Sequence, residues 1–347
     1  MPSAKAGAEA GPLPGFADKR AFLESGAPWP DEPPPDCIET HASIVCLTRD
    51  RAWKLKKPVR LVHIDQRALE DRERFCREEL RLNRELAGEV YRGLTPLVQR
   101  ADGGLALGGE GVVIDWVIET LRLPADEMLD RRLAAGPAPT TEEIAVLAEV
   151  LLGFYGRQPR LRRAGDVFWR RLTRDAALSV RHLREMAALA GIAPSDRTLD
   201  YATRAVEQAR GEILERAARG ELIEGHGDLR AEHVCLTRPP VVFDRLEIDG
   251  ALRRLDPFFE VNALGLECGL LGGGWIRAQL LARLAQAFAP PSEQLLSIFG
   301  VVACVTRARI AADHFRDAEV AKPEKYRAAA RAYLKLAADL VDAAQDR

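Results

Sequence analysis

Short apolar segments separated by polar turns dominate the first third of the chain. Residues 44–47 and 52–56 are apolar-rich and are joined by a polar turn, which is typical of two strands in a hairpin. Further strand-like segments follow a proline and a glycine-rich turn, at residues 97–99, 105–107 and 112–118. Between these groups, residues 66–88 carry apolar side chains at helical spacing. The first 120 residues therefore predict a small sheet that carries one helix.

The rest of the chain has mostly helical periodicity. Thr140 and Glu143 form a capping-box pattern ahead of an apolar run. Further helices are predicted over residues 166–191, 197–219, 275–288, 292–316 and 323–345. Three glycines at 272–274 indicate a helix break rather than a phosphate loop. One non-helical island, residues 225–249, interrupts the series, and such islands are where functional sites tend to lie.

The pattern also predicts how the chain is divided. Residues 1–15 are rich in Ala, Gly and Pro and predict a flexible tail, and the proline-rich stretch 28–36 predicts a connector. We expect a sheet-containing lobe over residues 16–120 and a helical lobe over residues 121–347. The fold class is therefore α+β, with a small antiparallel-sheet lobe and a larger, mainly helical lobe.

Composition and charge exclude several classes of protein. Of 347 residues, 47% are hydrophobic and 29% are charged, a balance that excludes a disordered or fibrous chain. The formal net charge of −2 argues against a nucleic-acid-binding protein, which needs a basic surplus. No apolar run reaches the roughly 18 residues of a membrane span, and the segment 295–305 suits a buried core helix.

The six cysteines are far apart and contain no C-x-x-C pair. They are Cys37, Cys46, Cys76, Cys235, Cys268 and Cys304. This spacing predicts reduced, small apolar side chains rather than a disulfide framework or a zinc site. Because the first 16 residues also lack the features of a secretory signal, we expect a cytoplasmic protein.

The non-helical island has the composition of a phosphoryl-transfer site. Asp228 follows a His-Gly pair on a loop, and Asp244 ends an apolar strand pair sixteen residues later. One such carboxylate can orient a hydroxyl and receive its proton, and the second can hold Mg²⁺ against nucleotide phosphates. Alternatively, Asp228 is a loop carboxylate that caps a helix or pairs with Arg230.

The island resembles the catalytic and metal-binding loops of the aminoglycoside phosphotransferase and choline kinase family, which is related to protein kinases. The resemblance covers about residues 17–285 and includes residues 39–43, 52–59, 79–83 and 122–124. It is strongest to a bacterial branch in which some members carry a fused C-terminal P-loop domain. The sequence contains no G-x-x-x-x-G-K-[ST] motif, so we expect that domain to be absent.

The resemblance implies a role for each matching position. Asp228 corresponds to the catalytic base, Asp244 to the main magnesium ligand, Lys54 to the strand lysine at the nucleotide phosphates and Glu79 to its helix partner. The positions expected to surround the nucleotide are Thr40, His41 and Ser43 in a phosphate-covering turn, and Glu119 and Leu121 in the hinge that receives adenine. The implied cofactors are ATP and Mg²⁺, with Mn²⁺ as a possible substitute.

The residues alone leave some choices open. Lys54 and Lys56 lie two apart on a strand and share a face, and Glu78 stands beside Glu79. His233 occupies a position where the family usually has asparagine, and an imidazole is a poorer ligand than an amide oxygen for Mg²⁺. His233 is therefore either a metal or phosphate contact or a hydrogen-bonded loop histidine.

Two further groups of charged residues are candidates for ligand binding. The first is a set of acids that follows Asp244 and suits a cationic or polyhydroxyl substrate, or only caps loops: Glu247, Asp249, Asp256 and Glu260. The second is a run of seven arginines between residues 157 and 174, which suits an anionic ligand or a solvated helix face.

The sequence therefore predicts an ATP-dependent phosphotransferase that acts on a hydroxyl of a small molecule, with no nucleic-acid or membrane partner. The alternative is a nucleotide-binding pseudokinase that serves as a scaffold or sensor. A third possibility is transfer of the nucleotide instead of the γ-phosphate.

Overall fold

The chain divides into two compact units in the computed structural model, which describes residues 13–61, 64–316 and 322–346. In the described residues, the sheet unit comprises positions 13–124 together with Phe243–Ile248, and the helical unit comprises positions 125–242 and 249–346. The predicted α+β class is confirmed. The predicted tail, residues 1–15, lies outside the described residues up to position 12.

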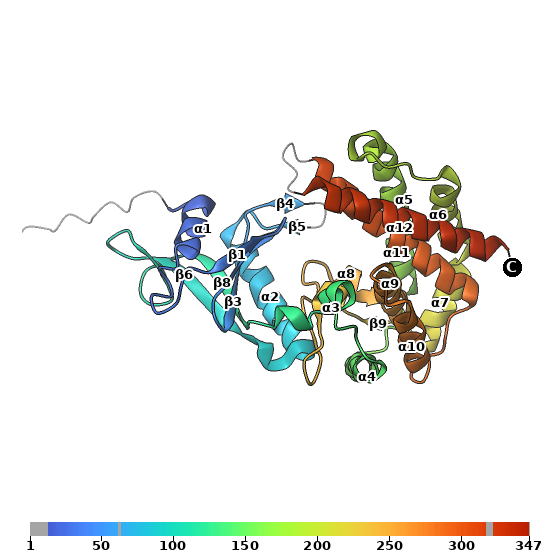
Figure 1. Cartoon of the computed structure of the whole chain (residues 1–347), viewed down its shortest axis with the longest axis horizontal. Coiled ribbons are helices and arrows are strands. Elements are labelled where there is room, and N and C mark those ends of the chain that lie inside the picture. Colours follow the sequence, from blue (N-terminus) through green and yellow to red (C-terminus); the bar gives the residue numbers. More distant parts are fainter. Residues whose placement is uncertain (1–12, 62–63, 317–321, 347) are drawn as a thin grey trace, which may run out of the picture. The chain divides into compact units, whose positions relative to one another are not determined.

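The sheet unit is built on a six-stranded antiparallel sheet with the strand order β1-β2-β3-β8-β6-β7 (Figure 1). Its strands are β1 (Asp36–Glu39), β2 (Ser43–Leu47), β3 (Arg51–Lys56), β6 (Tyr91–Gln99), β7 (Leu105–Leu107) and β8 (Val112–Leu121). The unit also contains β4 (Arg60–Leu61), β5 (Ile64–Asp65) and helices α1 (Phe16–Glu24) and α2 (Leu69–Ala87). Helix α2, the helix predicted over residues 66–88, packs against β6 and β8.

A buried ionic cluster attaches both helices of this unit to the sheet. The Asp115 carboxylate on β8 accepts hydrogen bonds from Lys19 Nζ of α1 at 2.9 Å and from Arg72 Nε of α2 at 2.9 Å. All three side chains are buried, and Lys19 also donates to the Ile114 carbonyl. Since a buried carboxylate needs such partners, the cluster fixes α1 and α2 on the strand that leads to the predicted hinge.

The helical unit consists of ten α-helices, one of them a single turn, and two short two-stranded ladders in the described residues. The helices are α3 (Leu129–Ala135), α4 (Thr141–Arg157), α5 (Gly165–Ala190), α6 (Asp196–Gln208), α7 (Arg210–Arg219), α9 (Pro257–Leu270), α10 (Gly274–Leu284), α11 (Glu293–Asp313) and α12 (Pro323–Gln345). A further single turn, α8 (Gly250–Arg253), precedes α9. The ladders pair β10 (Val234–Cys235) with β11 (Val241–Val242) and β12 (Arg254–Leu255) with β9 (Ile223–Glu224).

Helix α11 is the core helix of this unit. The segment Glu293–Arg316 is long and apolar enough, by length and composition alone, to cross a membrane. In the structure, however, 61% of its most apolar stretch is buried inside the protein. Helices α5, α9 and α12 pack around it. The expectation of a buried core helix at residues 295–305 is therefore met.

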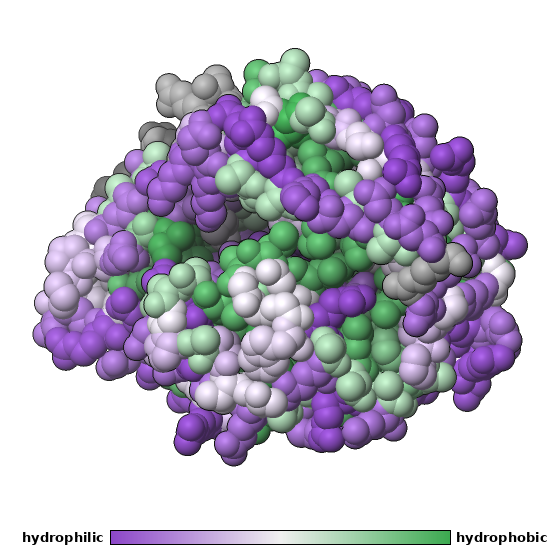
Figure 2. Space-filling model, turned by 45° about the vertical axis from the view of Figure 1, so that its right-hand side comes forward, coloured by the Kyte–Doolittle hydropathy of each residue, from purple (hydrophilic) through white to green (hydrophobic). Residues whose placement is uncertain are grey.

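The face drawn in Figure 2 is mainly hydrophilic, with apolar patches between the polar residues.

One predicted helix is split in the structure, and helix α9 was not predicted. The helix expected over residues 197–219 is split into α6 and α7 at Ala209. Ala209 keeps right-handed backbone angles, and it is neither a glycine nor a proline, so its residue type does not mark the break in the sequence. Helix α9 was not expected within the acidic segment after the island. Its start is nevertheless encoded, because the Asp256 carboxylate accepts from the Phe258 N–H at 3.0 Å and Pro257 occupies the first turn.

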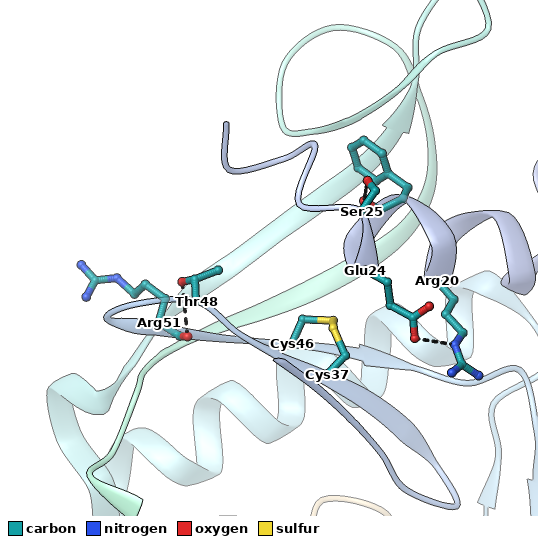
Figure 3. Close-up of a disulfide and its surroundings, with 8 residues drawn as sticks. Arg20, Glu24, Ser25, Cys37, Cys46, Thr48 and Arg51 are labelled. Atoms are coloured by element: carbon teal, nitrogen blue, oxygen red, sulfur yellow. Dashed lines mark hydrogen bonds and ion pairs between the residues drawn. A yellow bond between two sulfur atoms is a disulfide. The ribbon is translucent and has the colours of Figure 1, made fainter. Parts of the chain in front are cut away.

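The expectation that all six cysteines are unpaired is wrong for two of them. Cys37 on β1 and Cys46 on β2 form a disulfide, with their Cα atoms 4.1 Å apart (Figure 3). The two residues are direct register partners in the antiparallel ladder. The hairpin brings them face to face although they are nine residues apart. The other four cysteines, Cys76, Cys235, Cys268 and Cys304, are free and buried.

Candidate active site

Two lysines of strand β3 meet one buried glutamate of helix α2. Lys54 Nζ donates to Glu79 Oε1 at 2.8 Å, and Lys56 Nζ donates to Glu79 Oε2 at 2.6 Å. Both lysines reach the same carboxylate because residues two apart on a strand point to one face. Glu79 has 0% relative exposure, whereas Glu78 pairs with Arg81 on the exposed side of the helix. The structure thus selects Glu79 over Glu78, and it uses both lysines.

The same lysines also bind two carboxylates of the segment Phe243–Ile248. Lys54 Nζ donates to Asp244 Oδ1 at 2.8 Å, and Lys56 Nζ donates to Glu247 Oε1 at 2.5 Å. Five ionic groups therefore form one network in the sheet unit, with two positive and three negative charges. Lys56 was not expected to take part in the site. Its position two residues after Lys54 on the same strand is the feature of the sequence that indicates a shared face.

Hydrogen bonds from α2 hold the backbone around Asp244. Asn83 Oδ1 accepts from the Arg245 N–H at 2.8 Å, and Asn83 Nδ2 donates to the Arg245 carbonyl at 3.3 Å. The Tyr91 hydroxyl accepts from the Asp244 N–H at 3.3 Å. Asp244 has a φ of 61°, a left-handed conformation that is uncommon for a residue other than glycine. Strained backbone of this kind persists where surrounding contacts fix it, and it is frequent at functional sites.

The charges in the network determine each other's protonation. Burial acts to raise the pKa of Glu79, but Lys54 and Lys56 outweigh it, so the pKa lies below its ordinary value. Burial likewise acts to lower the pKa of Lys54, but Asp244 and Glu79 hold the pKa well above its usual value. Both groups are therefore ionised at neutral pH.

The predicted cover turn and hinge belong to the same sheet unit. Thr40 and Ser43 close the turn between β1 and β2, because the Ser43 N–H donates to Thr40 Oγ1 at 3.0 Å and the Thr40 N–H donates to the Ser43 carbonyl at 2.8 Å. His41 lies within this turn. At the end of β8, Glu119 pairs with Arg51 at 3.0 Å, and Leu121 is the last residue of the strand.

Asp228 lies on a loop of the helical unit that two glutamates of α9 hold in place. The Glu260 carboxylate accepts from the N–H groups of His226 and Gly227 at 3.0 Å each. The Glu267 carboxylate accepts from the Ala231 N–H and from Arg230 Nη2, both at 3.0 Å. Residues seven apart lie on one face of a helix, so a single face of α9 fixes both sides of Asp228.

The two histidines of the island lie against the backbone of this loop. Their rings stack, with centroids 5.8 Å apart. His233 Nδ1 lies 2.8 Å from the Asp228 carbonyl oxygen. Because a carbonyl can only accept, Nδ1 carries the proton, and in the neutral ring Nε2 carries the lone pair. His226 has 0% relative exposure, and its Nδ1 accepts from the Asp228 N–H at 3.3 Å, so its contacts are structural.

Arg307 is a site residue that the sequence did not indicate. It projects from α11, and its guanidinium forms an ion pair with the Asp228 carboxylate. Burial acts to raise the pKa of Asp228, but Arg307, His233 and Arg230 outweigh it and hold the pKa well below its usual value. An arginine in a largely apolar helix carries no motif, so the pair is revealed only by the position of α11 beside the loop.

The acids that follow Asp244 all have partners within the protein. Glu247 binds Lys56, and Asp249 caps α8 through the Ala251 N–H at 2.8 Å. Asp256 is buried, binds Arg216 Nε at 2.6 Å and caps α9, and Glu260 holds the loop of Asp228. The alternative that these acids have structural roles, such as capping, therefore accounts for each of them.

Several arginines between residues 157 and 174 also have internal partners. Arg160 lies over the Phe288 ring at 4.0 Å, and Arg162 donates to the Ala218 carbonyl at 2.8 Å. Arg171 is buried and donates to the Leu252 carbonyl. These contacts explain three of the seven arginines without any ligand.

Comparison with known proteins places the fold. No family model matches the chain. An uncharacterized protein of Mycobacterium tuberculosis, Rv2004c, and its counterpart in Mycobacterium bovis, Mb2027c, are each 30% identical over 252 residues, which is 71% of this chain and 48% of theirs. The chain thus spans about half the length of the curated relatives it matches.

Among solved structures, a choline/ethanolamine kinase family protein from Mesorhizobium loti matches 95% of this chain and 99% of its own, with a TM-score of 0.51 and 14% identity. The chain has a protein-kinase-like fold. The GDP and kanamycin complex of APH(2")-IIIa matches 94% of this chain and 98% of its own, at a TM-score of 0.48 and 14% identity. The predicted resemblance to the aminoglycoside phosphotransferase and choline kinase family is confirmed at the level of the fold.

Proposed function

We propose that this protein is an ATP-dependent phosphotransferase that acts on a hydroxyl of a small molecule. The observation that carries the proposal is the position of Lys54, whose ammonium group lies between Glu79 and Asp244 at 2.8 Å from each. A strand lysine held by a helix glutamate is the arrangement that binds nucleotide phosphates in kinases. The kinase-like fold supports the same conclusion.

On this proposal, each residue of the sheet unit has a defined task. Lys54 binds the nucleotide phosphates, and Glu79 keeps its ammonium group in place and charged. Lys56 holds Glu79 from the other side and attaches Glu247 to strand β3. The turn from Thr40 to Ser43 covers the phosphates. The end of β8, at Glu119 and Leu121, receives the adenine.

The residues also suit a divalent cation. Mg²⁺ is usually held by one or two carboxylates together with substrate phosphates and several waters. Asp244 provides such a carboxylate, on backbone that α2 holds in an uncommon conformation. His233 is the further ligand that the sequence suggests, and its Nε2 lone pair suits Mn²⁺ better than Mg²⁺. When bound, the metal neutralises charge on the transferred phosphoryl group.

Asp228 acts on the acceptor. Its low pKa keeps the carboxylate ionised at neutral pH, so it can accept a hydrogen bond from the acceptor hydroxyl and orient it toward the phosphorus. The proton moves to Asp228 as the new oxygen–phosphorus bond forms, while the bond between the γ-phosphorus and the bridging oxygen of ATP breaks and ADP leaves. The side chain is 32% exposed, which leaves room for such a contact. The α9 glutamates keep the loop from moving during this step.

The experiment that tests the proposal measures ATP consumption over a panel of small hydroxyl compounds, with Mg²⁺ and with Mn²⁺. We expect turnover with a subset of acceptors and a product whose mass is increased by one phosphoryl group. A mass increase equal to a nucleotide would instead establish nucleotidyl transfer. Failure to bind ATP in a parallel thermal-shift titration would contradict the proposal.

The second candidate is a nucleotide-binding pseudokinase. It is favoured by one observation, the engagement of His233 Nδ1 by the Asp228 carbonyl at the position where the family usually has an amide ligand. The same two assays separate the candidates. Binding of ATP without turnover of any acceptor, and without basal hydrolysis, would favour the scaffold.

A further inference from the structure

The guanidinium of Arg307 has hydrogen-bonding capacity that the protein does not fill. Among the described residues, Asp228 is the one polar partner that the structure gives it. A guanidinium carries five N–H groups, and in folded proteins such donors are nearly always paired with protein groups or solvent. The side chain is 20% exposed, so the remaining donors are open to a ligand.

These donors lie at a pocket of the helical unit. Arg307 lies at a small pocket of about 10 Å³, room for a single water molecule, that Leu229, Leu266, Cys304 and Tyr333 also line. Leu229 directly follows Asp228 in the chain, so the pocket adjoins the proposed site of phosphoryl transfer. An anion would bind at the mouth of this pocket, where the mostly apolar walls strengthen an ionic contact.

Among the described residues that line this pocket, no carboxylate is available for a cation. Glu267 also lines it, but its two oxygens accept from Arg230 Nη2, the Ala231 N–H and, at 3.2 Å, the Tyr333 hydroxyl. Glu260 accepts from two backbone N–H groups of the loop. A cationic acceptor would therefore find no free counter-charge apart from Asp228 itself, and it would meet the positive charge of Arg307.

We propose that Arg307 is a specificity-determining residue and that the acceptor carries an anionic group, a carboxylate or a phosphate, that binds its guanidinium. This inference rests on the proposed function and names the class of its substrate. A planar guanidinium suits such a group, because two parallel N–H donors match two oxygens. In this arrangement Asp228 and the bound anion share Arg307, which places the acceptor hydroxyl within reach of the carboxylate.

Inorganic phosphate and D-glycerate are suitable probes, with glycerol and choline as neutral and cationic hydroxyl compounds. We expect calorimetry, with the nucleotide site saturated by the ATP analogue AMPPNP and Mg²⁺, to show saturable binding of phosphate and D-glycerate. Arg307→Gln should weaken this binding about 10- to 100-fold, the effect of losing hydrogen bonds to a charged group. Arg309→Gln is the matched control, because Arg309 lies on the same helix and pairs with Asp313.

A second variant keeps the test decisive if Arg307→Gln does not fold. Asp228→Asn removes the carboxylate that competes for Arg307, so phosphate should bind several-fold more tightly than to the wild type. Anion binding that is absent, or equal in Arg307→Gln, Asp228→Asn and the wild type, would overturn the proposal. Preferential binding of choline would overturn it as well.

The two proposals fail in different ways. If AMPPNP does not bind, the phosphotransferase function is contradicted even when phosphate binding still depends on Arg307. If AMPPNP binds and ATP is consumed with neutral or cationic acceptors only, the function stands and the anionic acceptor is contradicted.

Discussion

The Lys54 and Asp244 side chains are 190 residues apart in the sequence, and they meet at 2.8 Å. The contact forms because the segment Phe243–Ile248 packs with the sheet unit rather than with the helices that precede and follow it. Asn83 and Tyr91 hold the backbone of this segment. Asp244, the proposed metal ligand, is thus fixed beside Lys54 by local contacts within one unit.

Replacing Lys54 tests the phosphate-binding role. Lys54→Met removes the ammonium group aimed at the phosphates, and losing one such charge typically costs about 10²–10³-fold in rate. We expect kcat/KM for ATP to fall by about that factor, as measured by coupled ATP consumption. Lys57→Met is the matched control, because Lys57 pairs with Glu39 instead. Equal activity of Lys54→Met and the wild type would contradict the assignment.

Replacing Asp228 separates nucleotide binding from transfer. Asp228→Ala removes the group that orients the acceptor, so turnover should fall by about 10³-fold or more. Affinity for AMPPNP in calorimetry should stay within a few-fold of the wild type, since the nucleotide-binding residues belong to the sheet unit. A variant that folds normally and keeps full turnover would exclude Asp228 as the acceptor-orienting residue.

Lys56 should matter most for stability. Its ammonium group is buried between Glu79 and Glu247, and removing one partner of a buried ion pair typically costs about 3–5 kcal/mol. We expect Lys56→Met to lower the free energy of unfolding by that amount in urea titrations. Lys335→Met, which removes an exposed pair with Asp339, should cost about 0–1 kcal/mol. Similar losses in the two variants would show that the buried network is not a stabilising unit.

Acid should destabilise the protein through two ion-paired carboxylates, Glu79 in the sheet unit and Asp228 in the helical unit. The pKa values of Glu79 and Asp228 are lower in the folded protein than their ordinary values of 4.5 and 3.8. A group with a lowered folded-state pKa stabilises the protein above its unfolded-state pKa, and the contribution is lost as pH falls. The free energy of unfolding should therefore be constant near neutral pH and decline below about pH 4.5. An increase in stability on acidification through this range would contradict the assigned charge states.

The sequence predicted the strands and the helix that carry the site residues better than the contacts between those residues. The apolar-rich segments 44–47 and 52–56 and the helical spacing over residues 66–88 identified the strands and the helix that carry Lys54 and Glu79. The pairing of Glu79 with both lysines was not predictable, because it depends on how α2 packs on the sheet. Periodicity could not distinguish Glu79 from Glu78 for the same reason.

The contacts around Asp228 were harder still to predict from the sequence. Glu260 and Glu267 lie on a helix that was not predicted, although Asp256 and Pro257 mark its start. Arg307 lies 79 residues beyond Asp228, in a helix whose composition indicates only a buried core. The disulfide between Cys37 and Cys46 was missed because strand register, which places them opposite each other, is not encoded in cysteine spacing.

A crystal structure with AMPPNP and Mg²⁺ or Mn²⁺ tests the central claim most directly. We expect the ammonium group of Lys54 to contact a phosphate oxygen of the nucleotide, and the metal to be coordinated by the Asp244 carboxylate. A nucleotide bound away from both side chains, with the metal held by other residues, would contradict the proposed function.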